Sequence, residues 1–116
     1  QSKVVDGQAF RLLWNMTSSY TNQAKFMAVG GLMQIVKLLN AYRDMGDAAL
    51  QEQGCGIIRN LATGHAKQKR LVYSQGVVSA LCQAIALYPQ EPGVCLQAAT
   101  ALCILGEAAP PVSEEA

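Results

Sequence analysis

The fold is decided by a stretch that occurs twice, first as Gly7-Gln-Ala-Phe-Arg-Leu-Leu-Trp-Asn-Met-Thr17 and 45 residues later as Glu52-Gln-Gly-Cys-Gly-Ile-Ile-Arg-Asn-Leu-Ala62. A third copy, Leu96-Gln-Ala-Ala-Thr-Ala-Leu-Cys-Ile-Leu105, follows at a spacing of 44. The apolar positions shared by the copies recur at offsets of 4, 7, 8 and 11, which places them on one face of a helix. These positions are Val5/Leu50/Val94, Ala9/Gly54/Ala98, Leu12/Ile57/Ala101, Leu13/Ile58/Leu102 and Met16/Leu61/Leu105.

A second repeated unit lies between these copies. It is Phe26-Met-Ala-Val-Gly-Gly-Leu-Met-Gln-Ile-Val-Lys-Leu-Leu39, and it recurs 46 residues later as Val72-Tyr-Ser-Gln-Gly-Val-Val-Ser-Ala-Leu-Cys-Gln-Ala-Ile85. Gly30 and Gly76 hold matching places in it, and glycine adopts the backbone that a sharp corner between two helices needs. Each unit is therefore predicted to be a short helix followed, after the glycine, by a longer one.

Two residues predict where the later long helices begin. Asp47 suits the N-cap of a helix that starts at Ala48, because its carboxylate accepts hydrogen bonds from the free N–H groups of the first turn. Pro92 suits a first turn, since its missing N–H costs no hydrogen bond there. Turns are accordingly expected at residues 42–46 and 88–91.

The order of one long helix, then two sets of short, longer and long helix, resembles the armadillo repeat. The resemblance depends on Gly-Gly-Leu-x-x-Ile-Val-x-Leu-Leu at residues 30–39 and Asn-Leu-Ala at residues 60–62, and it covers residues 4–106. It implies an all-α fold, a right-handed α-solenoid of about two and a half repeats whose stacked units share one core. The expected organisation is an armadillo-like domain at 1–107, with a third helix at 4–18 and repeats at 22–63 and 65–106, and a flexible acidic tail at 108–116.

The composition is that of one folded domain. Of the 116 residues, 51% are hydrophobic and 15% charged, which is too apolar and too weakly charged for an intrinsically disordered chain. The formal net charge of +1 removes the electrostatic case for a nucleic-acid partner. Residues 1–90 hold all nine basic groups and four acidic ones, whereas residues 91–116 hold four acidic groups and no basic one. The two ends of the chain therefore differ in sign.

The cysteines stand in apolar surroundings without a C-x-x-C pair, so they are expected to be buried thiols of a reducing compartment, which implies a cytoplasmic protein. The only histidine, His65, is ten residues from the nearest cysteine, and neither a metal site nor a cofactor is predicted. Residues 71–90 carry no charge, but polar residues interrupt them, so a buried helix is favoured over a membrane span. The four cysteines are Cys55, Cys82, Cys95 and Cys103.

The resemblance also implies where a partner binds. The third helices of armadillo proteins line a groove, in which an asparagine at the place of Asn15 and Asn60 holds an extended peptide by its backbone. An amide suits this task because it offers donors and an acceptor together. In the alternative interpretation, each asparagine bonds the adjacent repeat and the tryptophan packs in the interior. The neighbours expected to contact partner side chains are Arg11, Trp14, Arg59 and Glu52.

The outer side of the third copy differs from the other two. It carries Ile104 where they have asparagine, with Leu96, Thr100 and Cys103 on the same side, so that its outward face is apolar. Terminal repeats normally carry polar outer faces, because such faces keep the array soluble. We therefore expect that the chain is cut from a longer array or associates with copies of itself through its ends.

The predicted function is that of a non-catalytic scaffold that binds a protein or an extended peptide along the groove. One alternative is a HEAT-like structural or self-assembling module without a peptide groove. Another is an enzyme that uses Cys55 as nucleophile and His65 as base, although the two residues belong to different helices. A nucleic-acid role would need a basic groove, for which only Arg11 and Arg59 qualify.

Overall fold

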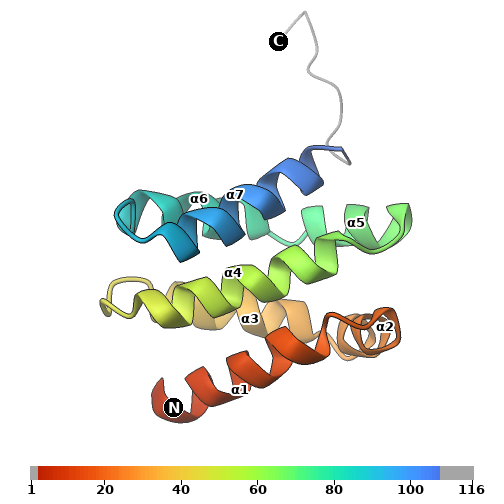
Figure 1. The fold of residues 1–116 in the computed structure, drawn as a ribbon. Helices are drawn as coiled ribbons and strands as arrows, with labels where there is room; N and C mark the ends of the chain where they lie inside the picture. The colour runs from red at the N-terminus through yellow and green to blue at the C-terminus, as the bar shows by residue number, and fades with distance from the viewer. Residues whose placement is uncertain (1–2, 108–116) are drawn as a thin grey trace, which may run out of the picture.

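The computed structural model describes residues 3–107, and within them the chain forms seven α-helices and no strand (Figure 1). The fold is therefore all-α, as the helical spacing of the apolar residues predicts. The expected acidic tail at 108–116 lies outside the described residues. The helices are α1 (Lys3–Met16), α2 (Tyr20–Ala28), α3 (Gly31–Ala41), α4 (Ala48–Ala62), α5 (Ala66–Tyr73), α6 (Val77–Leu87) and α7 (Pro92–Gly106).

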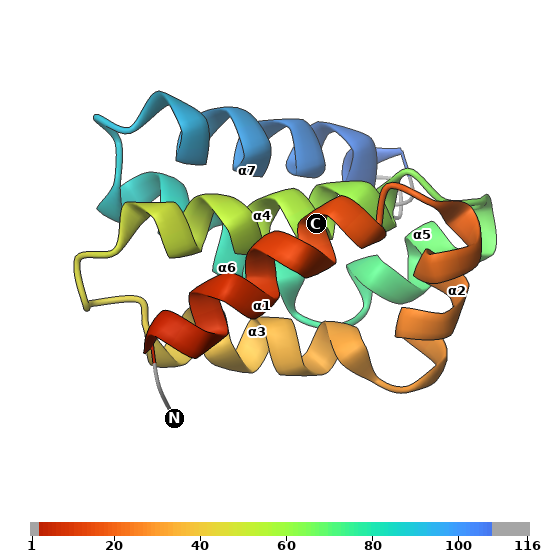
Figure 2. The ribbon, with the colours of Figure 1, turned by 60° about the horizontal axis from the view of Figure 1, so that its bottom comes forward.

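The long helices form a layer of their own, which we call the front layer. In it α4 lies between α1 and α7 and packs against both (Figure 1). Behind it, α3 packs on α4, α6 packs on α7, and α3 and α6 contact each other (Figures 1 and 2). The short helices α2 and α5 lie together at one side, where they connect the two layers (Figure 2).

The corners between the helices form where the sequence predicts them. Gly30 and Gly76 precede α3 and α6 with φ of 75° and 77°, a left-handed backbone that other residues adopt only with strain. The Asp47 carboxylate caps α4 by accepting a hydrogen bond from the Leu50 N–H at 3.0 Å. Pro92 occupies the first turn of α7, which confirms that prediction as well.

The first helix ends earlier than predicted. It ends at Met16 and not at residue 18, because hydroxyl side chains bond the last carbonyl oxygens of α1 and open a new helix. The Ser18 hydroxyl donates to the Asn15 carbonyl oxygen at 2.7 Å. Ser19 adopts an extended backbone and caps α2 by accepting from the Asn22 N–H.

The core is centred on α4. Its predicted apolar stripe is fully buried, with exposed fractions of at most 1% for Leu50, Ile57, Ile58 and Leu61. The matching residues of α1 differ: Leu12 and Met16 remain 59% and 43% exposed. A second helix covers the stripe of α4, whereas no described helix lies on that side of α1. Identical periodicity therefore leads to burial in one copy and exposure in another.

The prediction that all four cysteines are buried is wrong. Only Cys55 is buried; Cys95 is half-buried, and Cys82 and Cys103 are exposed, all four as free thiols. Cys82 and Cys103 lie on α6 and α7, on sides that no other described helix covers. Apolar sequence neighbours of a cysteine therefore do not show that it is buried, because a helix that packs on one side only leaves some of its residues exposed.

Among the described residues, no helix has both the length and the apolar character needed to cross a membrane by itself. The uncharged stretch noted in the sequence falls on α5 and α6, which meet that requirement only as a pair and are bent by 65° at the break between them.

Candidate functional site

The predicted binding residues all lie in the front layer, on the adjacent helices α1 and α4. They do not form one cluster. Arg11 and Asn15 are exposed on α1, and the other four are half-buried in the seams on either side of α4. These four are Trp14, Glu52, Arg59 and Asn60.

Asn60 is bonded to the neighbouring helix. Its side-chain Nδ2 donates to the Trp14 carbonyl oxygen at 2.8 Å and to the Thr17 hydroxyl oxygen at 3.2 Å. Both N–H groups of the amide are thereby used, and one of them satisfies the Trp14 carbonyl, which lies near the end of α1 and accepts no backbone N–H within the helix. For this asparagine, the structure favours the alternative interpretation, because the amide bonds the neighbouring helix α1 and the residue after it.

Asn15 has different surroundings. Its backbone carbonyl accepts from Ser18, but its side chain is exposed and makes no hydrogen bond to any other described residue. Arg11 is exposed one helical turn earlier, on the same side of α1. This pair presents an amide and a guanidinium side by side to the solvent.

Trp14 lies against α4 in the seam next to Asn60. A Cβ atom placed on Gly56 would lie 2.7 Å from Cζ2 of the indole and closer still to two other ring atoms, so only glycine leaves room for the ring. The indole is nevertheless only half-buried. The contact of Trp14 with Gly56 was not predicted from the sequence, although a glycine at the position that matches Arg11 is a signal for close packing there.

Glu52 and Arg59 turn toward α7, on the other side of α4. The Arg59 guanidinium donates through Nη1 to the Gln97 side-chain oxygen at 3.1 Å. The Glu52 carboxylate packs directly on Gly93, where a side chain would overlap it. Both groups contact α7 across the α4–α7 seam, and Gln97, the one amide side chain in a largely apolar helix, is the sequence signal that could have predicted the partner of Arg59.

Two glutamines join the corners of the fold. Gln23 and Gln68 are buried on α2 and α5, and their side chains bond to each other at 2.9 Å. Gln23 also donates to the Thr17 carbonyl oxygen at 2.7 Å, and Gln68 donates to the Leu61 carbonyl oxygen at 2.8 Å. Each glutamine therefore donates a hydrogen bond to a carbonyl oxygen at or just after the C-terminal end of the long helix that precedes it. Their recurrence at a spacing of 45 residues is a signal that sequence analysis missed.

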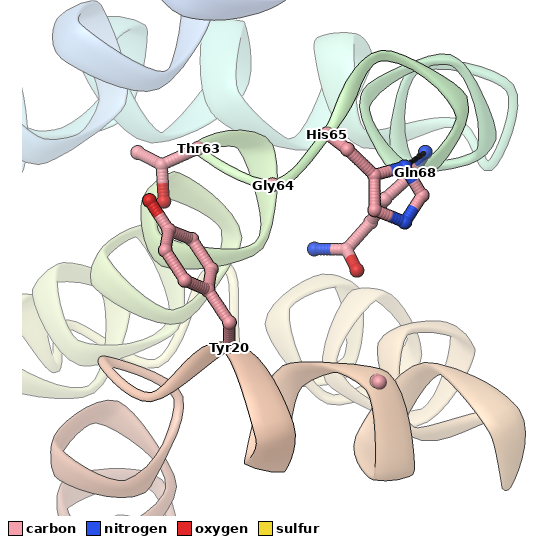
Figure 3. Close-up of a pocket in the computed structure, with 6 residues that line it drawn as sticks. Tyr20, Thr63, Gly64, His65 and Gln68 are labelled. Carbon is pink, nitrogen blue, oxygen red and sulfur yellow. Dashed lines mark hydrogen bonds between the residues drawn. The ribbon is translucent and has the colours of Figure 1, made fainter.

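A cavity of about 490 Å³ lies beside this glutamine pair, between α2 and the corner that joins α4 to α5. Tyr20 points into it from α2 toward Thr63, with His65 and Gln68 on the other side (Figure 3). Most of its polar groups already have partners: the Thr63 hydroxyl donates to the Asn60 carbonyl oxygen, and the His65 Nδ1 accepts from the Gln68 N–H. The cavity therefore has few free hydrogen-bonding groups with which to bind a polar ligand.

The pair proposed as an alternative enzyme site lacks the properties of a nucleophile and its base. Cys55 is fully buried, and burial together with the nearby Glu52 charge raises the pKa of its thiol to about 12. His65 is exposed and caps α5 through Nδ1. Elsewhere in residues 3–107, no group of three or more His, Cys, Asp or Glu residues is placed to hold a metal ion.

Comparison of the chain with models of protein families, with curated proteins and with solved structures finds no match in any of the three.

Proposed function

We propose that the chain is a non-catalytic protein-interaction module that binds an extended segment of a partner protein across its front layer. We further propose that α2 to α4 and α5 to α7 are two armadillo-like repeats and α1 the third helix of another, together forming a right-handed α-solenoid. The recurring order of helices and the matching corners at Gly30 and Gly76 support this assignment. Stacked repeats of this kind expose an extended surface that is suited to contacts along a chain.

The observation that carries the proposed function is the exposed pair on α1. The Asn15 amide is free to bond a peptide N–H and C=O at once, and the Arg11 guanidinium one turn away matches a carboxylate. The half-buried indole of Trp14 adds apolar area between this pair and α4. The segment that fits is therefore extended and carries an acidic side chain.

The second asparagine has a smaller part in this proposal than the resemblance implies. Because the Asn60 amide donates both of its N–H groups to α1, only its oxygen is left to accept from a ligand. Glu52 and Arg59 reach the surface from the α4–α7 seam, where they already contact α7. Binding should consequently depend on α1 more than on α4.

The test is selection of peptides from a displayed random library, followed by titration of the selected peptides into the purified chain. Trp14 is the only tryptophan, so its fluorescence reports binding at the site itself. We expect Arg11→Ala/Asn15→Ala to weaken binding by about tenfold or more, since two polar contacts are lost. The matched control is Lys37→Ala/Asn40→Ala, which removes one cation and one amide from the exposed side of α3.

Two outcomes would contradict the proposal. One is a library selection in which no peptide is enriched on the chain. The other is a set of selected peptides whose affinity falls equally, or more, in the α3 control. Thermal unfolding of both double variants separates loss of binding from loss of folding, because all four side chains are exposed.

A further inference from the structure

The corner cavity, as we call the cavity beside the glutamine pair, has walls from two parts of the chain that are far apart in sequence. One wall is α2, and the other is the turn that ends α4 and begins α5 (Figure 3). Both walls lie well inside the described residues, with further helices before and after each of them. The lining residues are Tyr20, Ala24, Thr63, Gly64, His65 and Gln68.

Most polar groups of the corner cavity are already bonded within the protein. The Gly64 N–H donates to the Leu61 carbonyl oxygen at 3.3 Å. The Gln68 amide donates both of its N–H groups, to the Gln23 side-chain oxygen and to the same Leu61 carbonyl oxygen. No described residue donates to the Gln68 Oε1, which is left as an acceptor on a buried, fixed side chain. A ligand that matches this cavity is therefore largely apolar and carries one hydrogen-bond donor.

Two aromatic rings stand on opposite sides of the corner cavity. Tyr20 points in from α2, and His65 lies across from it beside the Gln68 amide (Figure 3). The His65 ring is held in place by its Nδ1, which accepts from the Gln68 N–H at 3.2 Å. Gly64 leaves the room in which the Gln68 amide lies, since a Cβ atom there would overlap it. Two flanking rings suit a third ring better than an aliphatic chain, because aromatic pairs gain energy beyond the area they bury.

The second corner of the fold, between α5 and the end of α7, lacks these features. Helix α5 begins 46 residues after α2, so Ala66 stands at the place of Tyr20. By the same spacing, Arg70 stands at the place of Ala24. The cavity there, of about 330 Å³, contains an ion pair of 2.8 Å and is lined by Ala66, Lys69, Arg70 and Glu107. The uncharged aromatic lining thus belongs to the first corner alone and is not a consequence of the repeated helix order.

We propose that the corner cavity binds one aromatic side chain of a partner protein, a tyrosine or a tryptophan, with its ring between Tyr20 and His65 and its donor on the Gln68 Oε1. The volume of about 490 Å³ admits either ring. Tyr20 is 70% exposed, so the cavity stays open on that side and the backbone that carries the ring can leave it. A pocket for a free small molecule would instead enclose most of its ligand. Arg11 and Asn15 do not line the cavity, so this site is separate from the one proposed on α1.

The experiment is an NMR titration of the isotopically labelled chain with N-acetyl-tyrosinamide, a tyrosine flanked by peptide groups. We expect the backbone amide signals of Ala24, Gly64 and Gln68 to shift together and to saturate, with a Kd on the order of 1 mM for so small a probe. N-acetyl-leucinamide, which has no ring, should bind about tenfold more weakly or not at all. N-acetyl-phenylalaninamide keeps the ring but has no hydroxyl, and it should bind about threefold more weakly, since the Gln68 acceptor then loses its donor.

Two substitutions on α2 test the place of binding. Ala24→Arg gives the first corner the residue of the second, and its side chain should block the cavity and weaken N-acetyl-tyrosinamide binding by about tenfold or more. The matched control is Ala28→Arg, one turn later on the same helix, exposed and outside the cavity, which should leave the affinity within about twofold. Tyr20→Ala should weaken binding as well, whereas Tyr20→Phe should preserve it because the ring remains. Circular dichroism checks that each variant folds.

Several results would overturn the proposal. N-acetyl-tyrosinamide might as well bind elsewhere if its addition shifted no signal at the corner, or if Ala24→Arg and Ala28→Arg weakened it equally. Equal affinities of the tyrosine and phenylalanine probes would remove the hydrogen bond to Gln68. If p-cresol bound the cavity and N-acetyl-tyrosinamide did not, the ligand would be a free aromatic molecule and not a side chain of a protein. No peptide for the α1 site is used, so the outcome does not depend on the proposed function.

Discussion

Asn15 on α1 and Asn60 on α4 are 45 residues apart in matching sequence stretches, but only the Asn60 side chain bonds another helix. The Asn60 amide donates to the Trp14 carbonyl and to the hydroxyl of buried Thr17, whereas the Asn15 amide faces solvent. The sequence alone is compatible with both roles for each asparagine. The role of each asparagine depends on whether another long helix packs on the side of the helix that carries it. The tertiary arrangement of the helices decides this, and the sequence around the asparagine does not.

This difference predicts unequal effects on stability. Asn60→Ala should lower the free energy of unfolding by about 1–3 kcal/mol, because the Trp14 carbonyl and the Thr17 hydroxyl oxygen each lose the hydrogen bond from this amide. Asn15→Ala should change it by less than about 0.5 kcal/mol, as exposed substitutions usually do. Urea unfolding of the two variants gives the comparison, and equal losses would contradict it.

Because Cys55 is buried, we expect the free energy of unfolding to depend on pH in the alkaline range. Burial raises the pKa of its thiol from 9.0 to about 12, so above pH 9 the unfolded chain releases this proton more readily than the folded chain. The contribution of Cys55 is complete below pH 9 and is lost between pH 9 and about 12, a change on the order of 4 kcal/mol. The free energy of unfolding should therefore decline less steeply with pH in Cys55→Ala than in the wild type. Parallel curves for the two proteins would disprove this assignment.

The same burial makes the four thiols chemically distinct. We expect iodoacetamide at neutral pH to modify exposed Cys82 and Cys103 in the folded chain, and Cys55 only after unfolding. Mass spectrometry of peptides after a short and a long exposure measures the order. Modification of Cys55 at the rate of Cys82 would mean that α4 opens readily.

At the scale of the elements, α4 is the helix on which the others are arranged. It lies between α1 and α7, has α3 behind it, and its glycines receive Leu39 and Trp14. Helix α1 has the same apolar periodicity but packs on one side only. Equivalent residues of α4 and α1 should thus differ in their energetic contribution.

The matched substitutions Ile57→Ala and Leu12→Ala test this difference. Ile57 is fully buried, so its truncation leaves a cavity and should cost about 2–5 kcal/mol. Leu12 is 59% exposed, and its truncation in the monomer should cost less than about 1 kcal/mol. The measurement is denaturant unfolding at a concentration where the chain is monomeric. A large loss in Leu12→Ala under those conditions would indicate a cover on α1 that residues 3–107 do not show.

For the whole molecule, the peptide site should belong to the α1 edge of the front layer and be independent of the α7 edge. Leu96→Asp lies on α7 and should leave peptide affinity within about twofold, since Arg11 and Asn15 are on α1. Arg11→Ala/Asn15→Ala should weaken peptide affinity by about tenfold or more. Titrations followed by Trp14 fluorescence measure both affinities. Equal losses of affinity in the two variants would contradict a site on α1.

Local sequence alone determined the helices, their order and their corners. Capping by Asp47, the left-handed backbone at Gly30 and Gly76, and Pro92 in a first turn act within a few residues of the chain, and a helical stripe needs only the spacing of apolar residues. Only the tertiary structure decided which stripe is buried, which asparagine is bonded, and that two of the cysteines are exposed. The physical reason is that burial depends on whether another helix packs on a given side, and the repeated pattern is nearly the same whether or not one does.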